Sequence, residues 1–381
     1  MNYIERAVKK SFLKSMIPGK VLVLLGARRI GKTVFINEII NELKTPPLFL
    51  NGEDLGTHEI FRQRTIENYR MLLGDKKVLV IDEAQKIPEI GKALKLMVDE
   101  IKGIKIIVTG SSMFDLNNQL GEPLTGRKIT FHMFPLAQME FAKQENLVET
   151  RNQLETRLIF GSYPELLQYK TAAKKTQYLR ELVNSYLLKD ILAFENIRNS
   201  SKLLDLLKLL AFQMGSEVSL EELGRQLQIS KNTVERYLDL LSKVFVIYRL
   251  QGFSRNLRTE ITKHNKWYFY DNGIRNTLIA NHHPLSMRND TGALWENYLL
   301  SERIKYQSYS GMLANNYFWR TYQQQEIDFI EDKGGKLYAY EFKWKKDKPA
   351  KIPSAWADAY PKQKFEVITQ GNYLPWITGK K

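Results

Sequence analysis

Short runs of consecutive apolar residues dominate the first 150 positions of the chain. Four such runs, at residues 21–25, 47–50, 78–81 and 104–108, are separated by stretches in which apolar residues recur at helical spacing. Runs that are apolar throughout are typical of strands buried on both faces, as in a parallel sheet covered by helices. The pattern therefore predicts an α/β domain built on a parallel sheet.

The pattern changes after residue 153. Helical spacing replaces the strand-length runs up to about residue 202, and residues 203–270 predict three helices followed by two short strands. A segment with Pro, Ser and Asn at 282–289 indicates a linker, and beyond it we expect one helix and three strands. We therefore divide the chain into parts at 1–153, 154–202, 203–283 and 284–381.

Composition narrows the function classes. The 381 residues include no cysteine, which excludes disulfides, thiolate zinc sites and cysteine nucleophiles. The chain begins without an apolar signal segment and has no apolar run of membrane-spanning length, so we expect a cytoplasmic protein with no membrane partner. The formal net charge of +15 favours polyanionic partners such as nucleic acid, although a basic surface kept for solubility is the alternative.

Residues 26–33, Gly-Ala-Arg-Arg-Ile-Gly-Lys-Thr, fit the phosphate-loop pattern G-x-x-x-x-G-K-[ST] without a mismatch. They follow the apolar run 21–25 and precede a helical stretch, which is the context that this motif requires. Backbone N–H groups and the helix N-terminus would bind phosphates, Lys32 would neutralise their oxygens, and Thr33 would ligate Mg²⁺. ATP and Mg²⁺ are the expected cofactors. The candidate nucleotide-binding residues of the loop are Gly26, Ala27, Arg28, Arg29, Ile30, Gly31, Lys32 and Thr33.

The apolar run 78–81 ends in two acidic residues, which is typical of a Walker B strand. Asp82 would hold Mg²⁺ and Glu83 would polarise the attacking water, so we expect an Mg²⁺-dependent ATPase. Ser111 follows the run 104–108, where a γ-phosphate sensor would lie, although Thr-Gly-Ser-Ser is also an ordinary turn. Arg127 is a candidate arginine finger, acting in cis or in trans, with an ordinary surface arginine as the alternative.

Five segments together resemble one family, the prokaryotic AAA+ (archaeal-type) ATPases with a C-terminal domain of uncharacterised function. The resemblance covers nearly the whole chain. It implies an AAA-like ATPase domain at 1–153, a helical lid at 154–202, a winged-helix domain at 203–283 and a nuclease-like α/β domain at 284–381. The segments, in chain order, are GARRIGKT, VLVIDEAQKIPEI, IIVTGSSMFDL, LTGRKITFHMFPLAQMEF and FGSYPELL.

A helix-turn-helix is predicted inside the third part. Ser219 would cap a helix over 219–227, and a three-residue turn leads into a second helix over 231–242. The residues at 244–250 and 267–270 would form the wing. A winged helix also serves as a protein-packing module, so DNA binding is one of two interpretations. The candidate nucleic-acid residues are Lys231, Asn232, Thr233 and Arg236.

The last part carries a carboxylate pattern. Asp328 is followed thirteen residues later by Glu341-Phe-Lys343, and Glu296 lies on the preceding predicted helix. This order resembles the PD-(D/E)XK nuclease arrangement, with Ile327 in place of the proline. Glu296, Asp328 and Glu341 would hold Mg²⁺ while Lys343 positions a water. Two alternatives stay open: an ordinary polar sheet face, and a site in which the lysine satisfies one acid and leaves the cluster inert.

Two functions follow from these features. The first is an ATP-driven switch that acts on nucleic acid, with or without cleaving it. The second is a nucleotide-dependent protein-interaction switch whose C-terminal domain is an inactive nuclease-like fold. A homo-oligomer is required only if Arg127 acts in trans. The five histidines show no metal-ligand spacing.

Overall fold

The computed structural model describes residues 3–111, 124–187, 200–254, 265–345, 351–361 and 363–379. The chain forms two compact units, one of residues 2–135 with 243–245 and the other of residues 136–242 with 246–381. The three parts expected after residue 153 thus fall within one unit. No helix of the described residues is long and apolar enough to cross a membrane.

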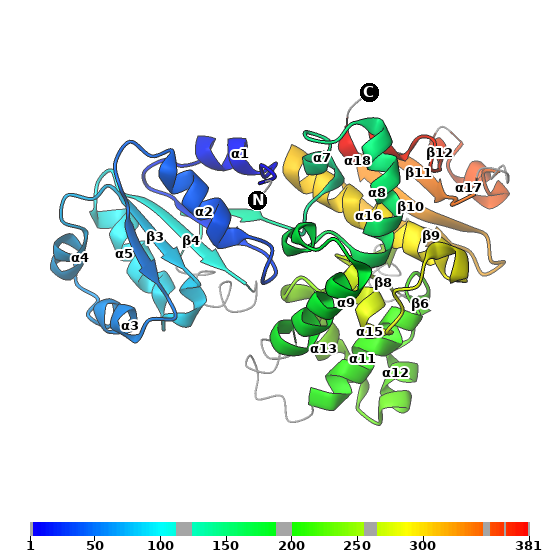
Figure 1. Ribbon diagram of the computed structural model, residues 1–381, viewed down its shortest axis with the longest axis horizontal. Helices are drawn as coiled ribbons and strands as arrows, with labels where there is room; N and C mark the ends of the chain where they lie inside the picture. The colour runs from blue at the N-terminus through cyan, green and yellow to red at the C-terminus, as the bar shows by residue number, and fades with distance from the viewer. Residues whose placement is uncertain are drawn as a thin grey trace. The chain divides into compact units, whose positions relative to one another are not determined.

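The first unit is built on a five-stranded parallel sheet, as the apolar runs predict (Figure 1). The strand before the phosphate loop, β1 (Val21–Leu25), lies between β4 (Lys105–Gly110) and β5 (Lys128–His132), and all five of its residues are buried. The fifth strand is absent from the sequence prediction because its Lys-Ile-Thr-Phe-His sequence is only partly apolar and its side chains are half-buried or exposed. In sheet order the strands are β2 (Leu48–Asn51), β3 (Val78–Asp82), β4 (Lys105–Gly110), β1 (Val21–Leu25) and β5 (Lys128–His132).

The helices of this unit begin at polar caps or pack through aromatic residues. Asp54 accepts a hydrogen bond from the Gly56 N–H at the start of one helix, and Thr65 caps the next. The Phe12 ring lies 5.4 Å from that of Phe35 and joins two helices through the core. The helices are α1 (Lys9–Lys14), α2 (Lys32–Asn41), α3 (Leu55–Arg62), α4 (Ile66–Leu73), η1 (Ala84–Lys86) and α5 (Ile90–Glu100).

The second unit contains one seven-stranded sheet of order β12-β11-β10-β9-β7-β8-β6. Parallel pairing of Gln251 with Tyr317 joins the strands of the helix-turn-helix segment to those of the C-terminal segment. The sequence indicates a boundary at 283/284, but the sheet is continuous across it. The strands are β6 (Glu217–Val218), β7 (Ile247–Gly252), β8 (Asn265–Phe269), β9 (Asn315–Arg320), β10 (Glu326–Lys333), β11 (Lys336–Phe342) and β12 (Lys364–Ile368).

Helices surround this sheet, and the longest of them has 20 residues. They are α7 (Gln138–Phe141), α8 (Leu147–Phe160), η2 (Pro164–Gln168), α9 (Ala172–Glu181), η3 (Leu182–Leu187), α11 (Ser200–Phe212), α12 (Leu220–Leu227), α13 (Lys231–Lys243), α15 (Asn272–Leu278), η4 (Leu285–Met287), α16 (Thr291–Ser310), α17 (Ser354–Ala359) and α18 (Tyr373–Thr378).

The predicted linker at 282–289 is anchored by a buried ion-pair network. Arg288 Nε donates to Asp290 Oδ1 at 2.8 Å, Arg288 Nη2 donates to Asn276 Oδ1 at 3.0 Å, and Arg275 also pairs with Asp290. Burial alone would raise the pKa of Asp290, but the two arginines lower that pKa to about 2. The segment is therefore held to the unit rather than left free.

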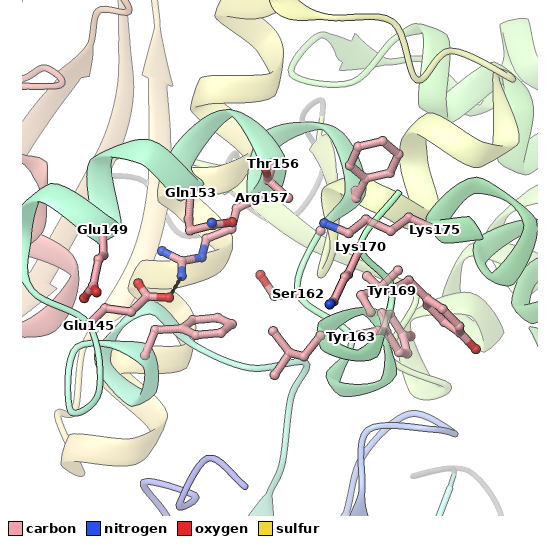
Figure 2. A pocket seen from close by; sticks show the side chains of 15 residues that line it. Glu145, Glu149, Gln153, Thr156, Arg157, Ser162, Tyr163, Tyr169, Lys170 and Lys175 are labelled. Carbon is pink, nitrogen blue, oxygen red and sulfur yellow. Dashed lines mark hydrogen bonds and ion pairs between the residues drawn. The ribbon is translucent and has the colours of Figure 1, made fainter. Parts of the chain in front are cut away.

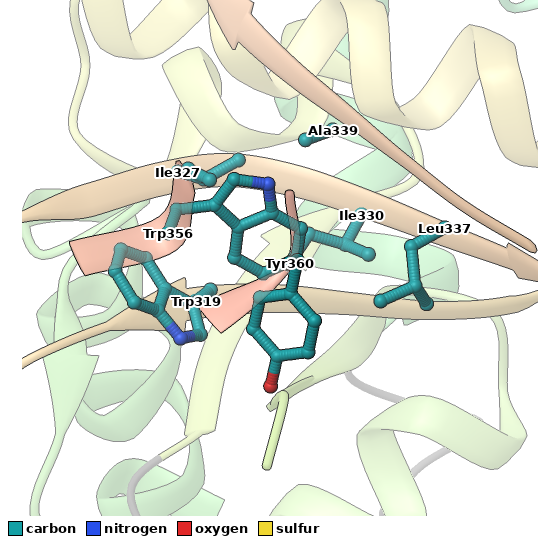
Figure 3. Packing of buried hydrophobic residues seen from close by; sticks show 7 residues of the cluster. All are labelled: Trp319, Ile327, Ile330, Leu337, Ala339, Trp356 and Tyr360. Atoms are coloured by element: carbon teal, nitrogen blue, oxygen red, sulfur yellow. The ribbon is translucent and has the colours of Figure 1, made fainter. Parts of the chain in front are cut away.

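A cluster of aromatic and aliphatic side chains packs on one side of the C-terminal strands. The rings of Trp356 and Tyr360, at α17, lie 4.3 Å apart, and Trp319 meets Trp356 edge-on at 5.3 Å. Figure 3 shows these rings beside Ile327 and Ile330 of β10. The apolar faces of the predicted strands thus form a core, which fixes the direction of the polar residues that alternate with them.

Candidate nucleotide site

The loop between β1 and α2 closes tightly. A Cβ on Gly26 would lie 2.1 Å from the Met133 carbonyl oxygen, and Gly31 has a φ of 89° at the start of α2. Lys32 Nζ donates to the carbonyl oxygens of Gly26 at 2.8 Å and Ala27 at 3.1 Å, and its side chain is 5% exposed. The carbonyl oxygens of the loop therefore hold the Lys32 ammonium beside the backbone that would bind a phosphate anion.

The other predicted loop residues divide between anchors and exposed positions. Ala27 and Ile30 are buried, and the Ile30 carbonyl accepts a hydrogen bond from Arg6 Nη1 at 3.3 Å. Arg28 is half-buried, and Arg29 is exposed with a φ of 62°. The two apolar residues therefore hold the loop in place, and of its two arginines only Arg29 is exposed.

The P-loop helix and the acidic strand meet at the carboxyl edge of the sheet. Thr33 Oγ1 donates to Asp82 Oδ2 at 2.9 Å. Strand β4 lies between β1 and β3, so its Thr109 reaches the same carboxylate: Thr109 Oγ1 donates to Asp82 Oδ1 and accepts from the Glu83 N–H at 3.0 Å. Hydroxyl and carboxylate oxygens are the ligands that Mg²⁺ prefers, so Thr33 and Asp82 fit the predicted ion.

Glu83 is held by side chains on both neighbouring segments. Gln85 Nε2 donates to Glu83 Oε2 at 2.5 Å, and Ser111 Oγ donates to the same oxygen at 3.1 Å. Glu83 Oε1 lies 4.0 Å from Lys32 Nζ. Ser111, predicted as a phosphate sensor, is buried and directs its hydroxyl to Glu83.

Gln85 is a site residue that sequence analysis misses. It lies in η1, two residues after the acid, and its Nε2 also donates to Ser111 Oγ at 3.1 Å. The sequence feature that could have identified Gln85 is its place in the segment Asp-Glu-Ala-Gln, at the end of the predicted Walker B strand.

The structure does not bring Arg127 to this site within one chain. The Val21 N–H donates to the Arg127 carbonyl at 2.8 Å, so Arg127 lies beside the first residue of β1, whereas the loop follows its last residue. Four residue steps of a strand span roughly 13 Å. The Arg127 guanidinium pairs instead with Asp99 of α5 at 2.6 Å. The cis role therefore does not hold, and the trans role stays a prediction.

The predicted carboxylate cluster of the C-terminal segment does converge. Burial raises the pKa of Asp328 well above its ordinary value, and the neighbouring charges of Glu296 and Glu341 raise it further. Burial likewise raises the pKa of Glu296, while Lys266 lowers it. Contacts place these acids near one another. The N–H of Phe342, next to Glu341 on β11, donates to Asp328 on β10. Lys266 lies between Glu296 of α16, at 4.0 Å, and Glu326 of β10.

Each acid of this cluster already has a partner. Lys343 Nζ lies 2.6 Å from Glu341 Oε1, the Phe342 N–H donates to Asp328 Oδ2 at 2.7 Å, and Tyr268 donates to Glu296 at 2.5 Å. Within the part of the chain that the structure describes, no group of three or more histidine or acidic side chains could hold a metal ion. Lysine, amide and hydroxyl donors thus pair with these carboxylates, and Mg²⁺ at this cluster stays a prediction.

The helix-turn-helix segment has the predicted helices. Ser230 Oγ accepts from the Thr233 N–H at 3.1 Å and caps α13. Lys231, Asn232 and Arg236 are exposed, and Thr233 is half-buried. Lys231 Nζ pairs with Glu221 of α12 at 2.5 Å. Lys266 of β8 is buried, and the basic residues at 255, 258 and 263, between the two wing strands, lie outside the described residues.

Three family models match successive parts of the chain. Residues 18–142 match an AAA domain, residues 151–285 match a domain of unknown function (DUF8612), and residues 291–378 match a second one (DUF4143). The first unit thus carries an AAA domain, as the phosphate-loop and Walker B patterns predict. A nuclease-like C-terminal domain stays a prediction.

Similar proteins extend over most of the chain. An uncharacterised protein of Methanocaldococcus jannaschii is 26% identical over 345 residues, which are 85% of this chain and 75% of that protein. An uncharacterised protein of Mycobacterium tuberculosis is 24% identical over 328 residues, covering 85% and 70%. A solved STAND-class signal-transduction ATPase with a tetratricopeptide repeat sensor, from Pyrococcus horikoshii, aligns with a TM-score of 0.32 and 12% identity, covering 81% of this chain and 48% of that one.

Proposed function

We propose that this AAA-domain protein hydrolyses ATP and uses the cycle as a switch that acts on nucleic acid. The observation that carries the ATPase proposal is the meeting of the loop and the acidic strand. Thr33 contacts Asp82 at 2.9 Å, and Glu83 lies 4.0 Å from the loop lysine. A binding loop, a pair of magnesium ligands and a separate carboxylate are the parts that phosphoryl transfer to water needs.

Bound Mg²⁺ would neutralise charge that develops on the phosphate oxygens. Side chains of the protein would bind the phosphates and orient the attacking water. Lys32, now bonded to the carbonyl oxygens of Gly26 and Ala27, would exchange these acceptors for phosphate oxygens, which bind an ammonium group more strongly. Glu83 would orient the attacking water, and the hydrogen bonds from Gln85 and Ser111 would fix its direction.

Two substitutions test the ATPase proposal. Glu83→Gln should keep ATP affinity and lower turnover by about 10²–10⁴-fold, since the amide cannot serve as a base. Lys32→Ala should instead weaken binding. Glu100→Gln, at an exposed carboxylate of α5, is the matched control and should match the wild type. Equal turnover in Glu83→Gln and wild type would exclude Glu83 from the reaction.

The nucleic-acid part of the proposal rests on α13 and on charge. The order helix, strand, two helices and two strands over residues 200–269, with β8 between β6 and β7, supports a winged-helix interpretation. Lys231, Asn232 and Arg236 are exposed at the start of α13, where groove contacts are made. The net charge of +15 favours contact with phosphates.

Salt dependence of duplex DNA binding tests this part. Lys231→Ala combined with Arg236→Ala should weaken binding and reduce the slope of log K against log salt by about 2, close to one unit per lost phosphate contact. Lys208→Ala, at an exposed lysine of α11, should leave the slope unchanged. An unaltered slope in the double variant would exclude α13 from DNA binding.

A protein-interaction switch is the second candidate, and two observations favour it. Lys231 is already paired with Glu221 on the neighbouring helix. The C-terminal acids are satisfied by Lys343, a backbone amide and a tyrosine, so we do not propose cleavage. Under this proposal the C-terminal domain is a docking platform, and DNA affinity should be weak and indifferent to the α13 substitutions.

A further inference from the structure

The second unit contains a pocket of about 520 Å³ that the ATPase proposal does not use. It lies against α8, η2 and the start of α9, and every lining residue falls within residues 141–175 (Figure 2). Phe141, Phe160, Leu166 and Leu167 supply apolar walls. A volume of this size, with apolar walls and a few polar groups, is typical of sites for small organic molecules.

The side chains that line the pocket carry a net positive charge, with Arg157, Lys170 and Lys175 against Glu145 and Glu149. The lining acids are both engaged: Glu145 pairs with Arg157, and Glu149 accepts from the Asn146 N–H at 2.8 Å in the capping box of α8. Lys170 and Lys175 have no ion pair or hydrogen bond with a carboxylate among the described residues. Figure 2 shows both amines directed toward the pocket, on the side away from Glu145 and Glu149.

Lys175 is the more constrained of the two lysines. Its Nζ lies 5.5 Å from the centre of the Phe160 ring, and its side chain is half-buried. Burial lowers the pKa of Lys175, and no neighbouring acid offsets this effect. An anion placed beside this amine would supply the missing counter-charge.

The apolar wall is held in place by contacts outside the pocket. The imidazole of His282 stacks on Phe160 at 5.6 Å with an interplanar angle of 5°. After Gly161, whose φ is 73°, the Ser162 N–H donates to the buried carboxylate of Asp271 at 2.7 Å. The segment Phe-Gly-Ser-Tyr-Pro-Glu-Leu-Leu thus forms a wall that does not need to be ordered by a ligand.

We infer that this pocket binds a small organic anion, with its carboxylate or phosphate group between Lys170 and Lys175 and its apolar or aromatic body against Phe160 and Leu166. Arg157 is bonded to Gln138 and Glu145 and closes the opposite end. The pocket thereby gives the second unit a ligand site of its own, separate in sequence from the nucleotide loop.

Calorimetric titration with three probes tests this site. The probes are naphthyl phosphate, naphthoate and uncharged naphthalenemethanol, and the full chain carries Lys32→Ala so that the nucleotide loop does not hold the phosphate. We expect both anions to bind and the alcohol to bind at least tenfold more weakly. Comparison of the two anions then distinguishes a phosphate ligand from a carboxylate ligand.

Substitutions locate the binding. Lys170→Met and Lys175→Met should each weaken anion binding by about tenfold or more, because each removes one charged hydrogen bond. Lys174→Met, at the neighbouring exposed lysine of α9 that does not line the pocket, should have no effect. Lys170 is exposed, so its variant should fold normally even if Lys175→Met does not. The inference would be overturned if the alcohol bound as tightly as the anions, or if neither anion bound at millimolar concentration. It would also be overturned if Lys174→Met lost as much affinity as Lys170→Met.

Discussion

The hydrogen bond from Gln85 to Glu83 is the contact on which the proposed water-positioning role depends most directly. Gln85→Ala removes the 2.5 Å bond to Glu83 Oε2 and leaves the 3.1 Å bond from Ser111. A hydrogen bond to a charged group contributes about 1.5–3 kcal/mol, which corresponds to a factor of roughly 10–150 if the bond acts only in the transition state. We therefore expect kcat to fall by that factor.

ATP affinity should change little in this variant, because the Gln85 amide donates to Glu83 and Ser111, which are themselves outside the phosphate loop. Single-turnover hydrolysis at saturating ATP gives the rate, and equilibrium titration with a fluorescent ATP analogue gives Kd. Ser111→Ala should have a smaller effect, and the double variant should be non-additive because the two side chains are bonded to each other at 3.1 Å. Gln63→Ala, at an exposed glutamine, is the control. Turnover in Gln85→Ala equal to or above that of the wild type would refute the reasoning.

Three further predictions concern the loop and the second unit. Gly26→Ala should abolish measurable ATP binding, since its Cβ would lie 2.1 Å from the Met133 carbonyl; wild-type affinity by titration would contradict this. Arg303→Leu should lower the free energy of unfolding by about 3–5 kcal/mol in urea denaturation, because it leaves Glu331, which is fully buried and paired at 2.6 Å, without its main counter-charge. The pKa of Asp290 falls from 3.8 to about 2 on folding, so its contribution to stability is present above about pH 4 and is lost as the pH falls toward 2. Asp290→Asn should therefore flatten the fall in the free energy of unfolding between about pH 4 and about pH 2. An unchanged fall in this variant would contradict the role of Asp290.

Local sequence was sufficient for the parts of the site that are contiguous in the chain. The loop from Gly26 to Thr33 and the pair Asp82-Glu83 follow apolar strands directly, so their place at the carboxyl edge of a parallel sheet follows from strand direction alone. The two successive helices α12 and α13 were equally visible, because Ser219 and Ser230 cap helices whose apolar residues recur at regular spacing. The continuous sheet of the second unit was not visible, since pairing of Gln251 with Tyr317 joins segments that are far apart in sequence.

The sequence by itself determined the AAA domain, its parallel sheet and the residues that meet at the nucleotide site, because each depends on short-range patterns. Only the tertiary structure decided which partner each polar side chain has. It placed Arg127 beside Asp99 at the far end of β1, joined Gln85 to Glu83, and paired Glu341 with the amine of Lys343. It also brought Lys170 and Lys175 to one pocket in which neither lysine pairs with a described carboxylate. Charge pairing depends on distances of a few ångströms between side chains, and these distances are set by packing rather than by spacing along the chain.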